Sequence, residues 1–145
     1  MRVAEYHHGR TIITGMPTIL NIFLVAIGGA LGSVSRYLVG GWVQSVSRSI
    51  DFPFGTLTVN LIGCFVIGFL SQLAESRGVF TPEARAFVFI GILGGFTTFS
   101  SFSNETFNLM RDGEMTYALV NIGANVGLGL ALVWLGRAAA YMIWR

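Results

Sequence analysis

The chain has 145 residues, of which 53% are hydrophobic and 11% are charged, and its formal net charge is +2. Soluble domains carry about 25% charged residues, so this composition excludes an ordinary soluble domain and indicates an integral membrane protein. The basic residues are scattered arginines and the one cysteine is Cys64, which excludes a nucleic-acid-binding surface and an intrachain disulfide.

The first residues, MRVAEYHHGRTIITG, are polar and show no clear periodicity. We predict that residues 1–15 form a flexible tail and that residues 16–145 form a single transmembrane domain. Met16 directly precedes the first apolar segment, so the tail is interpreted as a start-site extension. The adjacent His7 and His8 are expected to be solvated rather than to bind a metal.

Four apolar segments have the roughly 20 residues that a membrane-spanning helix needs. They cover residues 18–43, 54–74, 86–109 and 117–144, and short polar turns connect them. Pro53 and Pro82 stand just before the second and third segments, where proline suits a helix start. We therefore expect an all-α, multi-pass membrane protein with four transmembrane helices, the third broken at Gly94 and Gly95.

The arginines predict how these helices are oriented. Four spans place both termini on one side, and six arginines belong to that side: Arg2, Arg10, Arg77, Arg85, Arg137 and Arg145. The other side has three: Arg36, Arg48 and Arg111. The positive-inside rule then favours cytoplasmic termini. A chain that starts at Met16 scores four against three, which is nearly no bias and is compatible with insertion in both orientations.

The polar residues expected inside the membrane are neutral. No acid lies near the middle of a span, which argues against a proton-coupled pump and a carboxylate-lined cation pore. Thr56 and Asn60 are four residues apart, as are Asn121 and Asn125, and their side chains can donate hydrogen bonds to a small anion. Such residues also join membrane helices, at about 0.6 kcal/mol each. For Asn60, packing and function both stay open.

Three phenylalanines follow the two glycines in the stretch GGFTTFSSF, residues 94–102. Phe99 and Phe102 are three residues apart, so they lie on one helix face beside hydroxyl groups. Aromatic rings have a positive edge, and two such edges could face an anion without any charged side chain. The same residues are also compatible with ordinary core or lipid-facing positions.

The stretches GGALGSVSRY (28–37), GTLTVN (55–60) and GGFTTFSSF together resemble the Fluc (CrcB) family of fluoride channels. The resemblance runs from about residue 17 to the end of the chain. It implies a passive, fluoride-selective channel that exports fluoride from the cytoplasm, located in the cell inner membrane. It also implies a dual-topology, antiparallel homodimer with two pores.

The resemblance further implies site residues. Asn60, Phe99 and Phe102 match the pore asparagine and the paired pore phenylalanines, Thr56 matches a neighbouring threonine, and Asn125 matches a polar position of helix four. The GG-x-TT break resembles the site of a structural, non-transported Na⁺ ion at the dimer interface, held by the backbone carbonyls of Gly94 and Thr97. Gly129 departs from the family pattern because it has no side chain to contribute.

Two other functions remain as alternatives. A small four-helix drug or cation exporter would need a membrane-embedded glutamate in the first helix, which here contains neither Asp nor Glu. A non-transporting membrane scaffold would explain the glycine-rich segments but not Asn60 beside a broken, hydroxyl-rich third helix. We do not expect an enzyme, because no nucleophile–base pair or metal-ligand cluster is visible.

Overall fold

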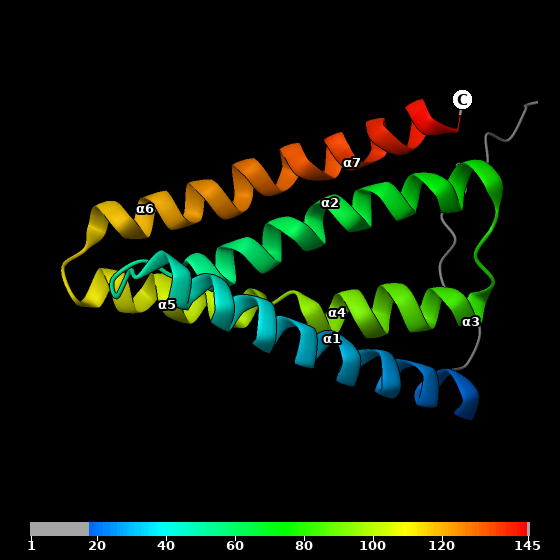
Figure 1. Ribbon diagram of the computed structural model, residues 1–145, viewed down its shortest axis with the longest axis horizontal. Coiled ribbons are helices and arrows are strands. Elements are labelled where there is room, and N and C mark those ends of the chain that lie inside the picture. The colour runs from blue at the N-terminus through cyan, green and yellow to red at the C-terminus, as the bar shows by residue number, and fades with distance from the viewer. Residues whose placement is uncertain (1–17, 145) are drawn as a thin grey trace, which may run out of the picture.

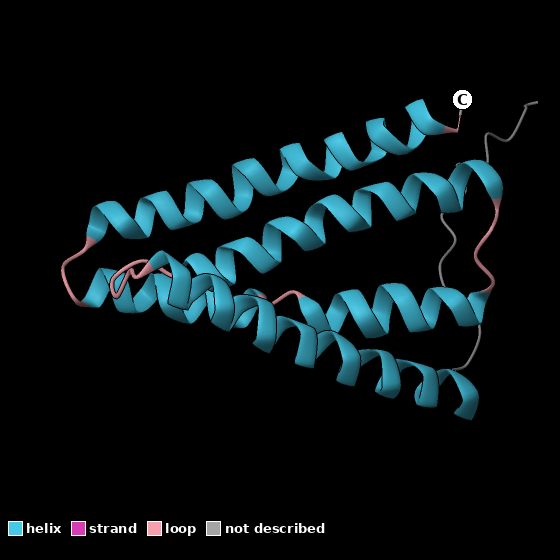
Figure 2. Ribbon diagram, in the orientation of Figure 1, coloured by secondary structure: helices cyan, strands magenta, loops and turns pink. Residues whose placement is uncertain are grey.

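The computed structural model describes residues 18–144, so the predictions for residues 1–15 lie outside it. Within this range all regular secondary structure is helical (Figure 2). Four helical stretches are long and apolar enough to cross a membrane: Ile19–Ser47, Phe54–Arg77, Pro82–Arg111 and Met115–Ile143. The predicted four-helix membrane architecture is therefore confirmed. Most ends lie within one turn of the predicted limits, which is the usual uncertainty of a helix boundary.

The first two spans are regular, and the last two are not. Helices α1 (Ile19–Ser47) and α2 (Phe54–Arg77) are continuous. The third span consists of α3 (Pro82–Arg85), the π-helical η1 (Ala86–Leu93), α4 (Gly94–Phe96) and α5 (Phe99–Arg111). The fourth consists of α6 (Met115–Gly123), the π-helical η2 (Ala124–Leu128) and α7 (Gly129–Ile143). Helical segments of π type are frequent at functional sites.

The four spans form two helix pairs (Figure 1). Helix α7 runs along α2, and α1 runs along the first half of the third span. The described ends of α1 and α7 lie at the same end of the molecule, as an even number of spans requires. We call this the terminal end. The loops 48–53 and 112–114 lie at the opposite end, which we call the loop end.

Glycines allow both pairs to pack closely. A Cβ atom on Gly28 of α1 would lie 2.6 Å from the carbonyl oxygen of Phe87 in η1. A Cβ atom on Gly68 of α2 or on Gly136 of α7 would lie even closer, 2.2 Å from a backbone oxygen of the facing helix. Small residues at membrane helix interfaces let the backbones approach in this way. Gly127 is different, because a Cβ atom there would meet no atom within 4 Å.

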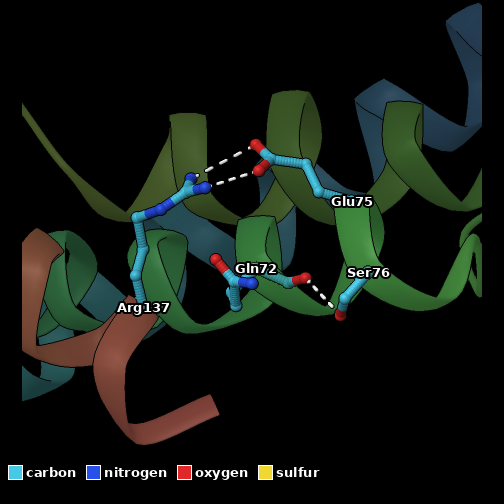
Figure 3. Close-up of polar contacts among 4 residues, drawn as sticks. All are labelled: Gln72, Glu75, Ser76 and Arg137. Carbon is cyan, nitrogen blue, oxygen red and sulfur yellow. Dashed lines mark hydrogen bonds and ion pairs between the residues drawn. The ribbon is translucent and has the colours of Figure 1, made fainter. Parts of the chain in front are cut away.

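An ion pair joins α2 to α7 near the terminal end (Figure 3). Arg137 Nη1 donates to Glu75 Oε1 at 3.2 Å, and Arg137 Nη2 donates to Glu75 Oε2. One turn earlier on α2, the backbone carbonyl of Gln72 accepts a hydrogen bond from the Ser76 hydroxyl at 2.7 Å. Glu75 thus offsets the charge of one of the arginines at this end.

Candidate functional site

The third span is interrupted at Thr97 and Thr98. Both residues are extended, with φ/ψ of −86°/160° and −152°/116°. The prediction of a break at Gly94 and Gly95 is wrong, because both residues are helical within α4. Gly95 serves packing instead, because a Cβ atom there would lie 2.6 Å from the carbonyl oxygen of Gly29 in α1.

Asn60 of α2 holds the interrupted backbone. Its Oδ1 accepts a hydrogen bond from the Thr98 N–H at 2.9 Å, and its Nδ2 donates to the Thr98 carbonyl at 3.2 Å. The Thr98 hydroxyl then caps α5 by accepting from the Ser101 N–H at 3.2 Å. Buried backbone groups need such partners wherever a helix stops. Long-range side-chain bonds therefore stabilise the break.

The carbonyls of Gly94 and Thr97, which were predicted to hold sodium, lose their usual backbone donors at this break. In an α-helix, the N–H of Thr98 would bond to the carbonyl of Gly94, and the N–H of Ser101 to that of Thr97. Here both N–H groups donate to side chains. The Thr97 hydroxyl donates to the carbonyl of Leu93 at 3.0 Å, so it does not compete for these oxygens.

A groove of about 370 Å³ lies beside the break. It brings together six of the seven residues predicted for the fluoride and sodium sites, which are Asn60, Gly94, Thr97, Phe99, Phe102 and Asn125. Cys64 and Thr98 also line it. None of the described residues that line the groove carries a charge.

The two predicted pore phenylalanines lie next to each other in this groove. Their ring centroids are 5.6 Å apart, and the ring planes are inclined by 59°. Phe102 is only 8% exposed, whereas Phe99 is 79% exposed. Phe102 is therefore part of the subunit's own core, and Phe99 projects away from it.

Thr56 lies apart from the groove, in a second, open cavity of about 800 Å³ at the loop end. Its hydroxyl donates to Glu105 Oε1 at 2.6 Å, and Glu105 Oε2 is buried with no partner among the described residues. Arg36 also lines this cavity. Thr98 lines both spaces and so separates this cavity from the groove.

A chain of hydrogen bonds leads from Asn60 into the interior. Asn60 Nδ2 donates to Asn125 Oδ1 at 3.0 Å, and Asn125 Nδ2 donates to Asn121 Oδ1 at 3.0 Å and to the Asn121 carbonyl at 3.0 Å. Asn121 Nδ2 donates to Thr106 Oγ1 at 2.9 Å, and the Thr106 hydroxyl donates to the Phe102 carbonyl at 2.7 Å. We call this chain the amide relay; its members are, in order, Thr98, Asn60, Asn125, Asn121, Thr106 and Phe102.

Two of these residues show what sequence reasoning missed. Asn121 stood out only by its spacing from Asn125. Thr106 was not predicted, because nothing in its local sequence distinguishes it from the other hydroxyl residues of the third span. Its partner Asn121 lies in the next span, 15 residues away.

Comparison with known proteins identifies the family of this chain. Residues 23–137 match the family model of the CrcB-like proteins, described as camphor resistance (CrcB). The chain therefore belongs to the CrcB family of membrane proteins. A "Fluoride-specific ion channel FluC" of Parabacteroides distasonis is 50% identical over 117 residues, which is 81% of this chain and 90% of the relative.

Other relatives have the same name. One of Geobacter metallireducens is 48% identical over 122 residues, covering 83% of this chain and 97% of the relative. One of Methylobacillus flagellatus is 46% identical over 115 residues, covering 79% and 90%. The resemblance seen in the sequence is confirmed, and so is the prediction that the chain is not an enzyme, because this is a family of ion channels.

Proposed function

We propose that the chain is a passive, fluoride-selective channel that exports fluoride from the cytoplasm across the cell inner membrane. The groove carries this proposal, because it joins two phenylalanine rings to hydroxyl and amide groups without any charged side chain. Positive ring edges attract a small anion weakly enough for it to leave again. The relatives, named fluoride-specific ion channels, support the same ion.

The direction of transport follows from the membrane potential. An interior-negative potential drives an anion outward with about 2.3 kcal/mol per charge per 100 mV. No coupled ion is then required. The described part of α1 contains no Asp or Glu, so the embedded carboxylate that a drug or cation exporter would need in this helix is not there.

We also propose that the working unit is a dual-topology, antiparallel homodimer. The groove is open, and Phe99 is too exposed for a large apolar residue that belongs to an ion path within a single subunit. A second copy would close the groove. The described arginines divide three to three between the terminal end (Arg77, Arg85, Arg137) and the loop end (Arg36, Arg48, Arg111), which favours insertion in both orientations.

We further propose a structural Na⁺ ion at the dimer interface, held by the carbonyls of Gly94 and Thr97 from both subunits. Carbonyls of unwound membrane helices are suitable sodium ligands, and here their usual donors are diverted. The test is thermal unfolding of the purified dimer in sodium and in a large organic cation. A ligand that binds only the folded state raises the melting temperature as its concentration rises. Equal melting temperatures would rule out the site.

Fluoride efflux from reconstituted liposomes tests the proposed function. Liposomes loaded with potassium fluoride should release fluoride once valinomycin allows potassium to leave, and liposomes without protein should not. Liposomes loaded with potassium chloride serve as the matched control and should release no chloride. A scaffold or a drug exporter predicts no fluoride release in any of these preparations.

A further inference from the structure

The amide relay has only one orientation that satisfies its chemistry. At its start, the Thr98 N–H can only donate, so Asn60 must present Oδ1 to it. Asn60 then presents Nδ2 to Asn125, which must accept through its own Oδ1. An asparagine amide accepts through its oxygen and donates through its NH₂ group, so the orientation of one asparagine determines that of the asparagine bonded to it.

The far end of the relay imposes the same orientation independently. The carbonyl of Phe102 can only accept, so the Thr106 hydroxyl donates to it and offers a lone pair to Asn121. Asn121 must therefore present Nδ2 to Thr106 and Oδ1 to Asn125. Backbone groups thus fix the orientation of the relay from both ends, and the Asn121 carbonyl, which accepts from Asn125 Nδ2, supports the same orientation in the middle.

The donors of the groove asparagines are fully used. Both N–H groups of Asn60 are engaged, one by Thr98 and one by Asn125. Both N–H groups of Asn125 are engaged by Asn121. In this arrangement Asn60 contributes to the groove by holding the break and placing α5, which begins with Phe99 immediately after Thr98.

We propose that Thr106 and Asn121 are positioning residues for the ion path. Both are buried, 6% and 1% exposed, and neither lines the groove or the loop-end cavity. They act through Asn125 and Asn60. Without the Thr106 hydroxyl, Asn121 can invert and turn Nδ2 toward Asn125. Asn125 Nδ2 then keeps only the backbone carbonyl of Asn121 as an acceptor and is repelled by the inverted Asn121 amide. The resulting shift of Asn125 moves its Oδ1 away from Asn60 Nδ2 and weakens the pairing of Asn60 with Thr98. This inference rests on the proposed fluoride channel.

The test compares Thr106→Val, which keeps the shape of threonine but removes the hydroxyl, with Thr106→Ser, which keeps the hydroxyl. Thr106→Val should lower fluoride efflux per folded dimer about tenfold, the rate equivalent of one buried hydrogen bond left unmade. Thr106→Ser should stay within about twofold of the unmodified chain, because the donor and the acceptor remain. In ¹⁵N spectra, the side-chain amide signals of Asn60 and Asn125 should shift in Thr106→Val only.

The double variant Thr106→Val/Asn121→Leu separates positioning from stability. Replacing both partners by apolar groups of similar shape is nearly neutral for stability, so the melting temperature should recover. Efflux should stay low, because Asn125 loses the Oδ1 acceptor and keeps only the backbone carbonyl of residue 121. Efflux that recovers together with the melting temperature would overturn the proposal. So would a Thr106→Val variant with normal efflux and unchanged amide signals. This double variant decides the matter if Thr106→Val alone does not fold.

These experiments distinguish a failure of the positioning role from a failure of the proposed channel function. If the unmodified chain passes no fluoride, the channel assignment fails, whereas the amide signals still report whether Thr106 orients Asn60. If the unmodified chain passes fluoride and the Thr106 variants all do so equally, only the positioning role fails.

Discussion

Asn60 is the side chain on which the interrupted third span depends. Its side chain forms hydrogen bonds with both the N–H and the carbonyl of Thr98, and its remaining N–H donates to Asn125 Oδ1. The alternatives of helix packing and function therefore meet in one residue: its hydrogen bonds hold the segment that carries the candidate ion path.

Asn60→Asp should abolish fluoride efflux and destabilise the protein. A carboxylate cannot donate, so the Thr98 carbonyl and Asn125 Oδ1 lose their partner and face a negative charge. Leaving buried acceptors unsatisfied costs about 1–3 kcal/mol each. Thermal unfolding and liposome efflux measure the two effects. Gln72→Glu introduces a carboxylate into the same helix near the terminal end and should be tolerated. An Asn60→Asp protein with unchanged melting temperature and efflux would contradict this role.

Phe99→Ile should reduce fluoride efflux strongly while leaving the subunit folded. Phe99 is 79% exposed, so an aliphatic group of similar bulk removes the ring edge with little loss of core packing. The buried Phe102 is a less clean target, because its replacement costs up to about 1.5 kcal/mol.

The matched control is Phe107→Ile, on the same helix, which is 64% exposed and does not line the groove. Efflux and size-exclusion profiles should be compared for both variants. If both lower efflux equally, the ring at Phe99 has no special part in conduction.

The sequence identified most of the candidate site, because donors and aromatic rings among apolar residues are visible in a one-dimensional pattern. Six of the seven predicted residues line one groove. Thr56 was separated from Asn60 because their common helix face passes from the groove to the loop-end cavity. The role of Thr106 could not be predicted, since it depends on a contact with a different span.

At the scale of the elements, the close glycine contacts and the helix break lie at different residues of the third span. Glycine weakens a helix, which suggested a break at Gly94 and Gly95. In the structure both glycines are helical and Gly95 contacts α1, while the break follows at Thr97 and Thr98. Its position is fixed by Asn60, 38 residues earlier in the chain. The existence of four spans follows from local composition, whereas the position of the break depends on a long-range contact.

Gly28→Ala should destabilise the contact between α1 and η1. The added methyl group would lie 2.6 Å from a backbone oxygen that cannot move aside without shifting its helix. Overpacking of this kind costs about 1–3 kcal/mol. Gly41→Ala is the control on the same helix, because a Cβ atom there meets nothing within 4 Å. Thermal unfolding should show a lower midpoint for Gly28→Ala only, and equal midpoints would contradict the packing role.

At the scale of the whole molecule, the arginines of residues 18–144 divide equally between the two ends. Adding arginines to one end should therefore force a single orientation. Val79→Arg with Glu83→Arg biases the terminal end, and Ile50→Arg with Glu114→Arg biases the loop end. All four positions are exposed. Each double variant expressed alone should give little fluoride efflux, because an antiparallel partner is missing.

Coexpression provides the control for that experiment. The two double variants, oriented oppositely, should together restore efflux in membrane vesicles. Full efflux from either variant alone, with accessibility labelling that shows one orientation, would contradict the antiparallel dimer.

The most direct test of a passive fluoride channel is the reversal potential across a planar bilayer. We propose a tenfold fluoride gradient with equal sodium and chloride concentrations on both sides. An ion that moves passively down its gradient gives about 59 mV for a tenfold ratio, which is 1.4 kcal/mol per charge. We predict a reversal potential at that fluoride value, unchanged when a large organic cation replaces sodium. A reversal potential near zero, or one that follows a sodium gradient, would contradict fluoride conduction.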